Sequence, residues 1–516
     1  MATPQEKLAD SLEELKSLQD RSIVAIRASD LSRTHRERLL KNGFLQQVMK
    51  GWFIPASPND DPGETTAWYA SFWDFCAAYL KERFGDDWCV GPEQSLMLQA
   101  GNHLVPPQLV IRSPKARNRP TGLMHDTSIY EMRLAMPDTK DIVEENGLRL
   151  FSPSAALIFA APAFFSQRPV DARTVLALFP DASEILAHLL EGGHSVIAGR
   201  LAGAFRNIGR DRIADDIIKN MEAAGYTIRE RDPFKTGVNI ALPRRETSPY
   251  AGRIRLMWQD MRGAVVDSFP QSPGMPNDAK AYLKRVEDVY VTDAYHSLSI
   301  EGYRVSPELI ERVRRGGWNP DSEEDRKHRD AMAARGYFLA FQSVKKSITA
   351  VLQHKNPGTV ADNDHGNWYR ALFGPSVTAG ILKASDLAGY RNNNVYIHRS
   401  KHVPLAPHAA RDAMPVFFEM LEAEDDPTVR AVLGHFIFVY IHPYMDGNGR
   451  MGRFLMNVML AGGGYPWTVI PVERRDDYMS ALEQASVEQN IVPFSQFLGD
   501  LVSASMAGRP AAKRPG

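Results

Sequence analysis

The chain has 516 residues, which is more than one hydrophobic core usually serves, so two or three domains are expected. Its 61 basic and 62 acidic residues give a formal net charge of −1. This balance excludes an overall field that would recruit nucleic acid or an anionic membrane, although a local basic patch stays open. The two cysteines, Cys76 and Cys89, fit neither a disulfide framework nor a four-ligand zinc site, and they favour a reducing compartment.

Targeting and membrane signals are weak in this sequence. The first residues, MATPQEKLADSLEELK, lack the apolar core of a secretory signal. The most apolar stretch, AALIFAAPAFF at 155–165, is too short to span a bilayer and contains a proline. We therefore expect a cytoplasmic protein without a membrane partner.

Residues 1–60 are predicted to form a winged helix-turn-helix-like domain. Leucines recur at helical spacing from Leu8 to Leu18, and SDLSRTHRERLLKNG indicates a second helix that ends near Gly43. FLQQVMKGWFIP alternates like two strands joined at Lys50-Gly51. Such a unit would bind DNA through a basic face made of Arg33, His35, Arg36, Arg38 and Lys50. A solvated helix surface explains the same charges equally well.

The rest of the chain divides by composition and periodicity. Residues 61–245 mix strand patterns, such as SIYEMRLAM, with helical ones, such as SEILAHLLEG, and are predicted to be a mixed α/β domain. Proline- and glycine-rich stretches near 235–252 and 268–278 predict a linker over 246–279. Residues 280–505 are predicted to be mainly helical, and the polar tail 506–516 to be disordered.

The segment HPYMDGNGRMGR, residues 442–453, concentrates polar and small residues in a short turn. The preceding apolar helix ends at Pro443, and a second helix begins after MDGNG with Arg450 and Arg453 in its first turns. A helix that follows a glycine-rich turn presents backbone N–H groups and a positive dipole end to an anion. Two arginines can bind further phosphate oxygens bidentately. The pattern therefore predicts a phosphate-binding site.

Two residues of this segment are suited to chemistry as well as binding. Asp446 is placed to bind Mg²⁺, which takes one or two carboxylates together with substrate oxygens. His442 has a near-neutral pKa in model peptides and can accept a proton from an attacking hydroxyl. Taken singly, each residue has a plain structural alternative as a helix-end histidine, a turn or a surface charge. The spacing is not that of a P-loop, and G-x-G alone does not indicate a dinucleotide fold.

The segment resembles the signature of the Fic family, H-x-F-x-[DE]-G-N-G-R-x-x-R, with Tyr444 in place of the usual phenylalanine. The resemblance covers roughly 280–505 and implies an all-helical core with a β-hairpin flap. The whole chain is then expected to be mainly α, with the winged helix-turn-helix and the mixed α/β domain in front. LAGYRNNNVYIHRSKHVPLAP is similar to the flap, which pairs with the backbone of a target protein through the residues at positions Asn394, Val395, Tyr396 and Ile397.

The family resemblance implies a reaction, because most Fic proteins transfer AMP from ATP to a Ser, Thr or Tyr hydroxyl of a protein and release pyrophosphate. ATP would be the substrate and Mg²⁺ the metal. By position, His442 would be the general base and Asp446 the metal ligand. The anion hole for the α- and β-phosphates would be Gly447, Asn448 and Gly449, and the β/γ end would be bound by Arg450 and Arg453. Relatives also transfer UMP, phosphocholine or phosphate, but the intact GNGR segment favours AMP.

Two further residues of this half are assigned from the same comparison. Tyr478 is a candidate to stack on adenine, with packing in the core as the alternative. His435 recurs in relatives, and we assign it to helix packing.

A second motif, SLSIEG at 297–302, lies about 140 residues earlier. In isolation it is a serine and a glutamate four apart on a helix, as in many surface pairs. It resembles the inhibitory helix of self-inhibited Fic proteins, [ST]-x-x-x-E-[GN]. The resemblance implies that Ser297 and Glu301 belong to a brake in which Glu301 pairs with Arg453 and blocks the γ-phosphate. Some relatives use the same glutamate to remove AMP, so a bifunctional enzyme stays open.

The N-terminal half resembles AbiEi-type antitoxins and regulators in LLKNGFLQQVMKGWFIP and LRLFSPSAALI. This resemblance implies DNA binding through Arg33, Arg36 and Lys50. The alternative to an adenylyltransferase is therefore a DNA-binding regulator whose Fic domain senses nucleotide or modifies itself. Recruitment of the target protein is an equally simple role for this half. The sequence does not identify the target protein. Self-modification and a homodimer are further partner arrangements that the sequence leaves open.

Overall fold

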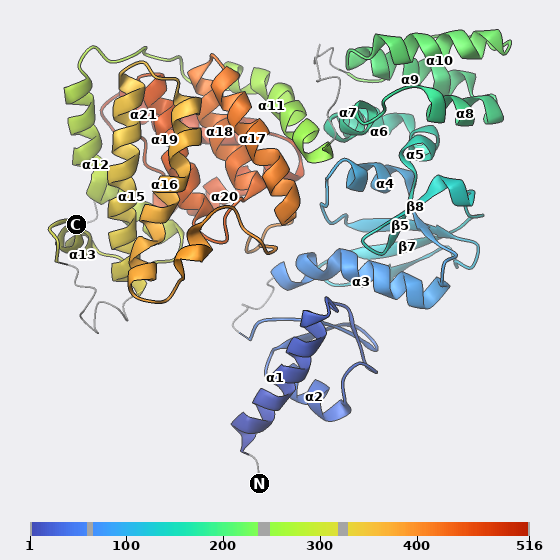
Figure 1. The fold of residues 1–516 in the computed structure, drawn as a ribbon, viewed down its shortest axis with the longest axis horizontal. Helices are drawn as coiled ribbons and strands as arrows, with labels where there is room; N and C mark the ends of the chain where they lie inside the picture. Colours follow the sequence, from blue (N-terminus) through green and yellow to red (C-terminus); the bar gives the residue numbers. More distant parts are fainter. Residues whose placement is uncertain (1–2, 59–64, 236–247, 318–328, 514–516) are drawn as a thin grey trace. The chain divides into compact units, whose positions relative to one another are not determined.

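The computed structural model describes residues 3–58, 65–235, 248–317 and 329–513 (Figure 1). The chain divides into two compact units. The first comprises Met1–Pro249 together with Tyr396–Val403, and the second comprises Tyr250–Val395 and Pro404–Gly516.

Residues 3–58 form a small helical layer with a three-stranded antiparallel sheet of order β1-β3-β2. Its elements are α1 (Pro4–Asp20), β1 (Ile26–Arg27), α2 (Arg33–Lys41), β2 (Leu45–Met49) and β3 (Trp52–Pro55). The capping box of Thr3 and Glu6 starts α1, and Gly51 takes the positive φ of 87° that the hairpin turn needs. The two helices and the hairpin expected in this region are therefore present, and β1 is an additional strand that was not expected.

The following region combines a four-stranded sheet with helices. The sheet has the order β4-β5-β7-β6, and β5 and β7 are parallel. Its elements are α3 (Thr66–Phe84), β4 (Cys89–Val90), α4 (Pro92–Gln99), β5 (Gln108–Ser113), β6 (Arg119–Gly122) and β7 (Ser128–Arg133), followed by the 3₁₀ turn η1 (Thr139–Asp141) and the hairpin β8 (Ile142–Glu145) and β9 (Leu148–Phe151). The aromatic face of α3 packs on the sheet, which makes one core of this part.

Short helices complete the first unit. They are α5 (Pro153–Phe159), α6 (Pro162–Gln167), α7 (Pro169–Ala177), α8 (Ser183–Gly192), α9 (Ser195–Asn207) and α10 (Asp211–Ala223). The mixed α/β character expected from the sequence is confirmed for the described part of 61–245.

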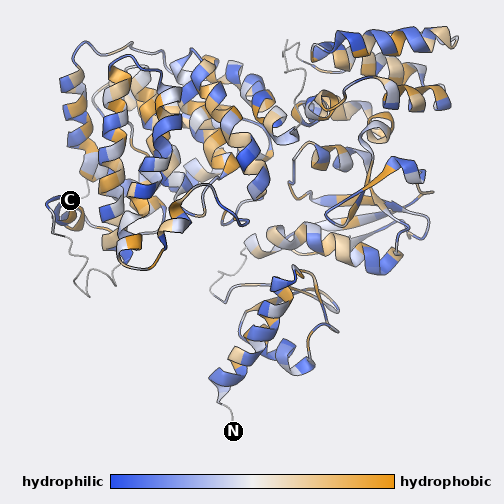
Figure 2. Cartoon of the chain, in the orientation of Figure 1, coloured by the Kyte–Doolittle hydropathy of each residue, from blue (hydrophilic) through white to orange (hydrophobic). Residues whose placement is uncertain are grey.

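The second unit is helical. Its elements are α11 (Pro249–Ser268), α12 (Ala279–Ile300), α13 (Pro307–Arg314), α15 (Arg329–Leu352), α16 (Pro357–Thr378), η2 (Ala384–Leu387), α17 (Pro407–Ala423), α18 (Pro427–Ile441), α19 (Asn448–Gly462), η3 (Val472–Arg474), α20 (Arg475–Val487) and α21 (Val492–Met506). α18 carries apolar residues on nearly every side, and Figure 2 colours it mainly as hydrophobic. Such a helix belongs in a core. α19 packs against α15, α16 and α18, so the turn between α18 and α19 is held from several sides.

The linker predicted over 246–279 is wrong for most of its length, because α11 is a helix of the second unit. Trp258 and Met261 of α11 are buried, and Arg255 and Arg262 pair with Glu419 and Glu424. The prolines and glycines around this helix suggested a loop, but the buried apolar face inside it decides the structure. The part of the predicted boundary at 236–247 lies outside the described residues.

Two other expectations of the second unit need correction. The flap segment between η2 and α17 has no β-strand, although all of it is described, so the predicted hairpin is not a paired ladder. The tail also packs where the structure describes it, because Ala512 is buried and His296 Nε2 lies 2.9 Å from Lys513 O. Residues 514–516 lie outside the described part. Among the described helices, none has the length and apolar character needed to cross a bilayer.

Candidate active site

His442 ends α18 in a left-handed conformation, with φ 54° and ψ 59°. A residue other than glycine pays roughly 1–2 kcal/mol for this conformation, so neighbouring bonds must hold it. Its amide donates to Phe438 O at 3.0 Å, and its Nδ1 lies 3.1 Å from Val439 O. Because a carbonyl can only accept, Nδ1 carries the ring proton and Nε2 keeps its lone pair. The imidazole is therefore the tautomer that a general base requires.

The surroundings keep this imidazole neutral. Burial lowers the pKa of His442 to about 4, and the positive charge of Arg391 acts in the same direction. Glu301 and Asp446 act to raise the pKa but do not outweigh the burial. At pH 7 the ring is thus uncharged, and its Nε2 can accept a proton.

The turn after His442 is fixed by its own backbone and one amide side chain. Gly447 has a φ of 79°, and a Cβ there would lie 2.9 Å from the ring of Phe373 on α16. Asn448 accepts from Tyr444 N at 2.9 Å and donates to Tyr444 O at 2.8 Å. The Asn448 side chain is therefore used to shape the turn. The first backbone N–H groups of α19 have no partner within the helix, which suits an anion.

Arg450 is buried beside this turn. Its guanidinium carbon lies 5.2 Å from the ring centre of Tyr303 and 5.1 Å from that of Phe373. Its Nη2 pairs with Asp446 Oδ2 at 3.3 Å, while Nε has no hydrogen-bond partner among the described residues. A buried guanidinium with an unused donor is a fit for a phosphate oxygen.

Arg453 lies one turn further along α19 and contacts the end of α12. Its Nε donates to Ser297 Oγ at 2.9 Å, and its Nη2 donates to Ser297 O at 3.0 Å and to Glu301 Oε1 at 2.7 Å. Its Nη1 is buried without a hydrogen-bond partner in the described part of the chain. The ion pair expected between Glu301 and Arg453 is therefore present, and Ser297 supports it.

Glu301 is ionised and lies at the start of α19. Burial acts to raise the pKa of Glu301, but Arg453 and Arg450 outweigh it and hold this pKa below its usual value. A Cβ at Gly449 would collide with Glu301 Oε1, so the carboxylate covers the backbone of the glycine-rich turn. The carboxylate thus lies beside the N-terminus of α19, where the helix dipole favours a negative charge.

Asp446 is open to solvent, with 63% of its side chain exposed. Its Oδ1 accepts from Gly447 N at 2.6 Å, which keeps the carboxylate beside the turn. The described residues contain no cluster of three or more His, Cys, Asp or Glu side chains that could hold a metal. Mg²⁺ would fit here only with phosphate oxygens and water as its other ligands, which is the way it usually binds with nucleotides.

The order of these residues matches a known family. Residues 368–460 match the model of the Fic/DOC family. This part of the chain is therefore similar to proteins of the Fic/DOC family. The match covers the end of α16, the flap segment, α17, α18 and most of α19, and so includes the turn and both arginines.

Known proteins similar to the chain bear the same family name. The chain is 28% identical over 252 residues to Protein adenylyltransferase Fic of Drosophila willistoni, and the aligned region covers 48% of this chain and 47% of that protein. It is 26% identical over 250 residues to Protein adenylyltransferase Fic of Nematostella vectensis, which covers 48% and 55%. The chain thus spans about half the length of these curated relatives.

Solved structures with some likeness also include Fic proteins. A fragment of Fic-1 from C. elegans is 17% identical with a TM-score of 0.37, over 69% of this chain and 94% of the fragment. A Fic domain-containing signalling protein from Bacteroides thetaiotaomicron is 19% identical with a TM-score of 0.33, over 49% and 95%.

Aromatic residues pack around the catalytic turn and around His435. Tyr444, which replaces the usual phenylalanine, stacks on Tyr369 with ring centres 3.8 Å apart. Tyr478 is 1% exposed, and its hydroxyl lies 2.7 Å from His435 Nε2. Phe494 and Phe497 pack against Tyr478. The structure therefore favours core packing over adenine stacking for Tyr478, and it places His435 in the same core.

Sequence reasoning missed three residues that contact this site. Tyr303 and Phe373 flank Arg450, and the buried Arg391 contacts the backbone of His442. Arg391 directly precedes the asparagine run of the flap segment, but nothing in that local sequence indicates a contact 51 positions away. The four residues predicted to pair with a target protein all lie in this segment between η2 and α17; they are Asn394, Val395, Tyr396 and Ile397.

Most of the basic residues predicted to face DNA bond to other residues of 3–58. Arg38 donates to Lys7 O and Ser11 Oγ, and His35 contacts the same serine. Arg36 donates to Ala28 O at 2.6 Å, and Arg33 pairs with Glu37 on the surface. Lys50 is exposed at the hairpin turn. The face predicted for DNA thus presents fewer uncommitted cations than the sequence suggests.

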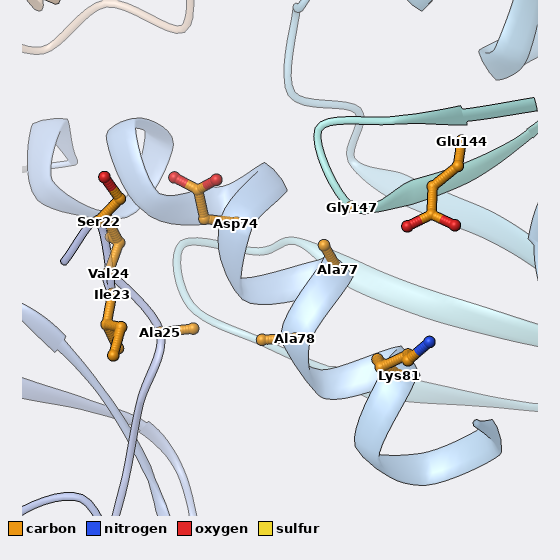
Figure 3. A pocket seen from close by; sticks show the side chains of 10 residues that line it. All are labelled: Ser22, Ile23, Val24, Ala25, Asp74, Ala77, Ala78, Lys81, Glu144 and Gly147. Carbon is orange, nitrogen blue, oxygen red and sulfur yellow. The ribbon is translucent and has the colours of Figure 1, made fainter. Parts of the chain in front are cut away.

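The first unit also has an open cavity of about 350 Å³. It is lined by residues 22–25, by residues of α3 that include Lys81, and by Glu144 and Gly147 (Figure 3). None of the residues predicted for catalysis or nucleotide binding lines it.

Proposed function

We propose that the chain is a protein adenylyltransferase, which transfers AMP from ATP to a Ser, Thr or Tyr hydroxyl of a protein. The observation that carries this proposal is the conjunction at one turn. A neutral imidazole with a free Nε2 adjoins a glycine-rich helix N-terminus, and two buried arginines there keep unused donors. The similarity to proteins named as adenylyltransferases supports the same reaction.

In the proposed reaction, His442 Nε2 accepts the proton of the attacking hydroxyl. A bond forms between that oxygen and the α-phosphorus, and the bond to the β-phosphate oxygen breaks to release pyrophosphate. The backbone of Gly447, Asn448 and Gly449 neutralises charge on the α- and β-phosphates, and Arg450 and Arg453 bind the β/γ end. Mg²⁺ at Asp446, when bound, would supply further neutralisation of the phosphate charge.

We propose further that Glu301 inhibits this reaction in the chain as it stands. Arg453 cannot bind a phosphate through Nη2 while that nitrogen holds Glu301. The Glu301 carboxylate also covers Gly449, where its charge would repel a triphosphate. Tyr303, from the same segment, covers one side of Arg450. Together these contacts favour a closed state of the nucleotide site.

The activity is tested with purified protein, Mg²⁺ and ATP labelled on the α-phosphate, alone and with cell lysate. The reference variant is Glu301→Gly, because the unmodified chain is expected to be inhibited. Label on protein that disappears in Glu301→Gly/His442→Ala supports AMP transfer, and label on the chain itself identifies self-modification. Transfer of label from the γ-phosphate would indicate phosphorylation, and no transfer from either label would contradict the proposal.

A second candidate function is a DNA-binding regulator. The order of helix, strand, helix and hairpin in residues 3–58 supports it, with the exposed Lys50 at the hairpin turn. An electrophoretic shift assay on the full chain at several salt concentrations tests it, because phosphate contacts give strong salt dependence. A shift that weakens with salt and with Lys50→Glu would support this function, and no shift at low salt would contradict it.

A further inference from the structure

We propose that Arg391 is a positioning residue of the transfer reaction, which fixes the flap segment and the backbone of His442 relative to each other. The inference rests on the proposed function for its catalytic consequence. Its structural part stands on the contacts of Arg391 alone.

Arg391 bridges three parts of the chain. Its Nε donates to His442 O at 2.7 Å, its Nη1 donates to Asn393 O at 3.0 Å, and its Nη2 donates to Leu405 O. Its backbone N–H donates to Pro443 O at 2.9 Å. The side chain is only 3% exposed. One buried guanidinium thus joins both arms of the flap segment to the turn that carries the imidazole.

The chemistry of arginine suits this position. A planar guanidinium presents donors in several fixed directions, whereas a lysine ammonium acts as a compact point charge on a flexible stem. The end of a helix also carries partial negative charge on its last carbonyls, and α18 ends at His442. A cation at His442 O is therefore favoured electrostatically. It holds the left-handed residue from its carbonyl side, while Phe438 O holds its amide.

The consequence for catalysis is geometric. The flap segment has no β-ladder between its two arms. The guanidinium of Arg391 instead links them, because it donates to Asn393 O in one arm and to Leu405 O in the other. A hydroxyl presented along this segment must meet His442 Nε2 at hydrogen-bond distance. Loosening Arg391 changes that alignment while leaving Gly447, Arg450 and Arg453 in place. The effect should fall on kcat and on the target, and not on ATP binding.

Arg411 offers a matched control in the same segment. It is exposed, and its guanidinium donates to Arg391 O at 2.9 Å and to Pro407 O at 3.1 Å. It also donates to Asn392 Oδ1 and to Tyr390 O, and its hydrogen bonds within the described part of the chain do not reach His442 or Pro443. Arg411→Met therefore loosens the outer side of the flap segment without releasing the catalytic turn.

The experiment combines hydrogen–deuterium exchange with transfer kinetics in full-length Glu301→Gly protein. The variants are Arg391→Met, Arg391→Lys and Arg411→Met, each compared with the parent. For both Arg391 variants we expect amide exchange at 390–395 and 442–446 to rise by at least about tenfold while other helices keep their protection. We expect kcat for α-label transfer to fall roughly ten- to a hundredfold, with KM for ATP nearly unchanged. Arg411→Met should affect exchange near 390–392 and keep kcat within about threefold of the parent.

The exchange measurement separates this inference from the proposed function. If the parent transfers no label, the adenylyltransferase proposal fails. Unchanged exchange at 442–446 in Arg391→Lys independently overturns the positioning role of Arg391. Exchange that rises throughout the helical unit would assign Arg391 to general stability and overturn the inference. Equal loss of kcat in Arg411→Met would assign the effect to the flap segment as a whole, and not to Arg391. If Arg391→Lys equals the parent in both measurements, only the charge of the side chain matters, which also contradicts the positioning role of the guanidinium.

Discussion

Glu301 Oε1 lies 2.7 Å from Arg453 Nη2, although the two residues are 152 positions apart in the chain. The pair joins the end of α12 to the first turns of α19. Both side chains are largely removed from solvent, with the arginine 5% and the glutamate 25% exposed. A pair in such surroundings is held more firmly than a surface ion pair, and breaking it leaves a buried charge.

Ser297→Ala should weaken the inhibition without removing it. The serine hydroxyl accepts from Arg453 Nε at 2.9 Å, and a hydrogen bond to a charged group contributes roughly 1.5–3 kcal/mol. Because Arg453 keeps its bonds to Ser297 O and Glu301 Oε1, only part of this free energy should appear in the rate, and we expect transfer of α-label to rise by roughly two- to tenfold over the unmodified chain, less than in Glu301→Gly. Ser299→Ala on the same helix is the control and should behave as the unmodified chain. A Ser297→Ala rate equal to that control would remove Ser297 from the brake.

The pH dependence of transfer should show no acid limb near 6.5. Burial places the pKa of His442 at about 4, so lowering the pH protonates the base only near that value. Glu301 acts to raise this pKa, and its removal in Glu301→Gly therefore does not bring the limb closer to neutrality. We expect kcat for that variant to stay level from pH 8 down to about 5.5 and to fall below about 5. An acid limb centred near 6.5 would contradict a buried, neutral His442.

The shape of the catalytic turn should depend on Asn448. Asn448→Ala leaves the buried N–H and C=O of Tyr444 without their partners, which costs about 1–3 kcal/mol of unfolding free energy. Asn457→Ala is the matched control, because this equally buried asparagine bonds Thr468 in the same reciprocal way. Thermal unfolding should show similar losses of stability in both variants. Transfer should be lost only in Asn448→Ala, and equal activity in the two would refute the role of the turn.

The docking of α11 is tested by Trp258→Ala. Trp258 is 1% exposed, and its Nε1 donates to Glu424 Oε2 at 3.2 Å. Truncating a buried tryptophan typically costs 3–5 kcal/mol, so we expect a large fall in the unfolding temperature of the helical unit. Val266→Ala on the same helix is the control, because Val266 is 42% exposed and should change stability by less than about 0.5 kcal/mol. Equal melting of the two variants would mean that α11 does not belong to this core.

The local features of the site could be predicted from the sequence. The end of a helix at His442, the turn at Gly447 and the following helix with Arg450 and Arg453 are determined by residues within twelve positions. The pairing of Glu301 with Arg453 was expected from the family resemblance alone. Spacing within one helix says nothing about which partner lies 152 positions away.

The errors have physical causes of two kinds. Proline- and glycine-rich flanks concealed the amphipathic α11, and a polar tail concealed the contact of Lys513 O with His296. In the flap segment, the family resemblance implied a hairpin, but the structure has no ladder there, and the Arg391 side chain bonds main-chain carbonyls of both arms. Such bonds from a side chain to distant backbone leave no periodic signal in a sequence.

The central claim is that this chain transfers AMP and that Glu301 holds the transfer back. The measurement that tests it most directly is the rate of α-label incorporation by Glu301→Gly relative to the unmodified chain, at equal ATP and Mg²⁺, with Glu301→Gln alongside. Glu301→Gly releases Arg453 from a charge-assisted pair, which should raise the rate by at least about tenfold. Glu301→Gln removes only the charge of the pair and should therefore give a smaller rise in the rate. Equal rates in all three proteins, with label that still depends on His442, would contradict the account.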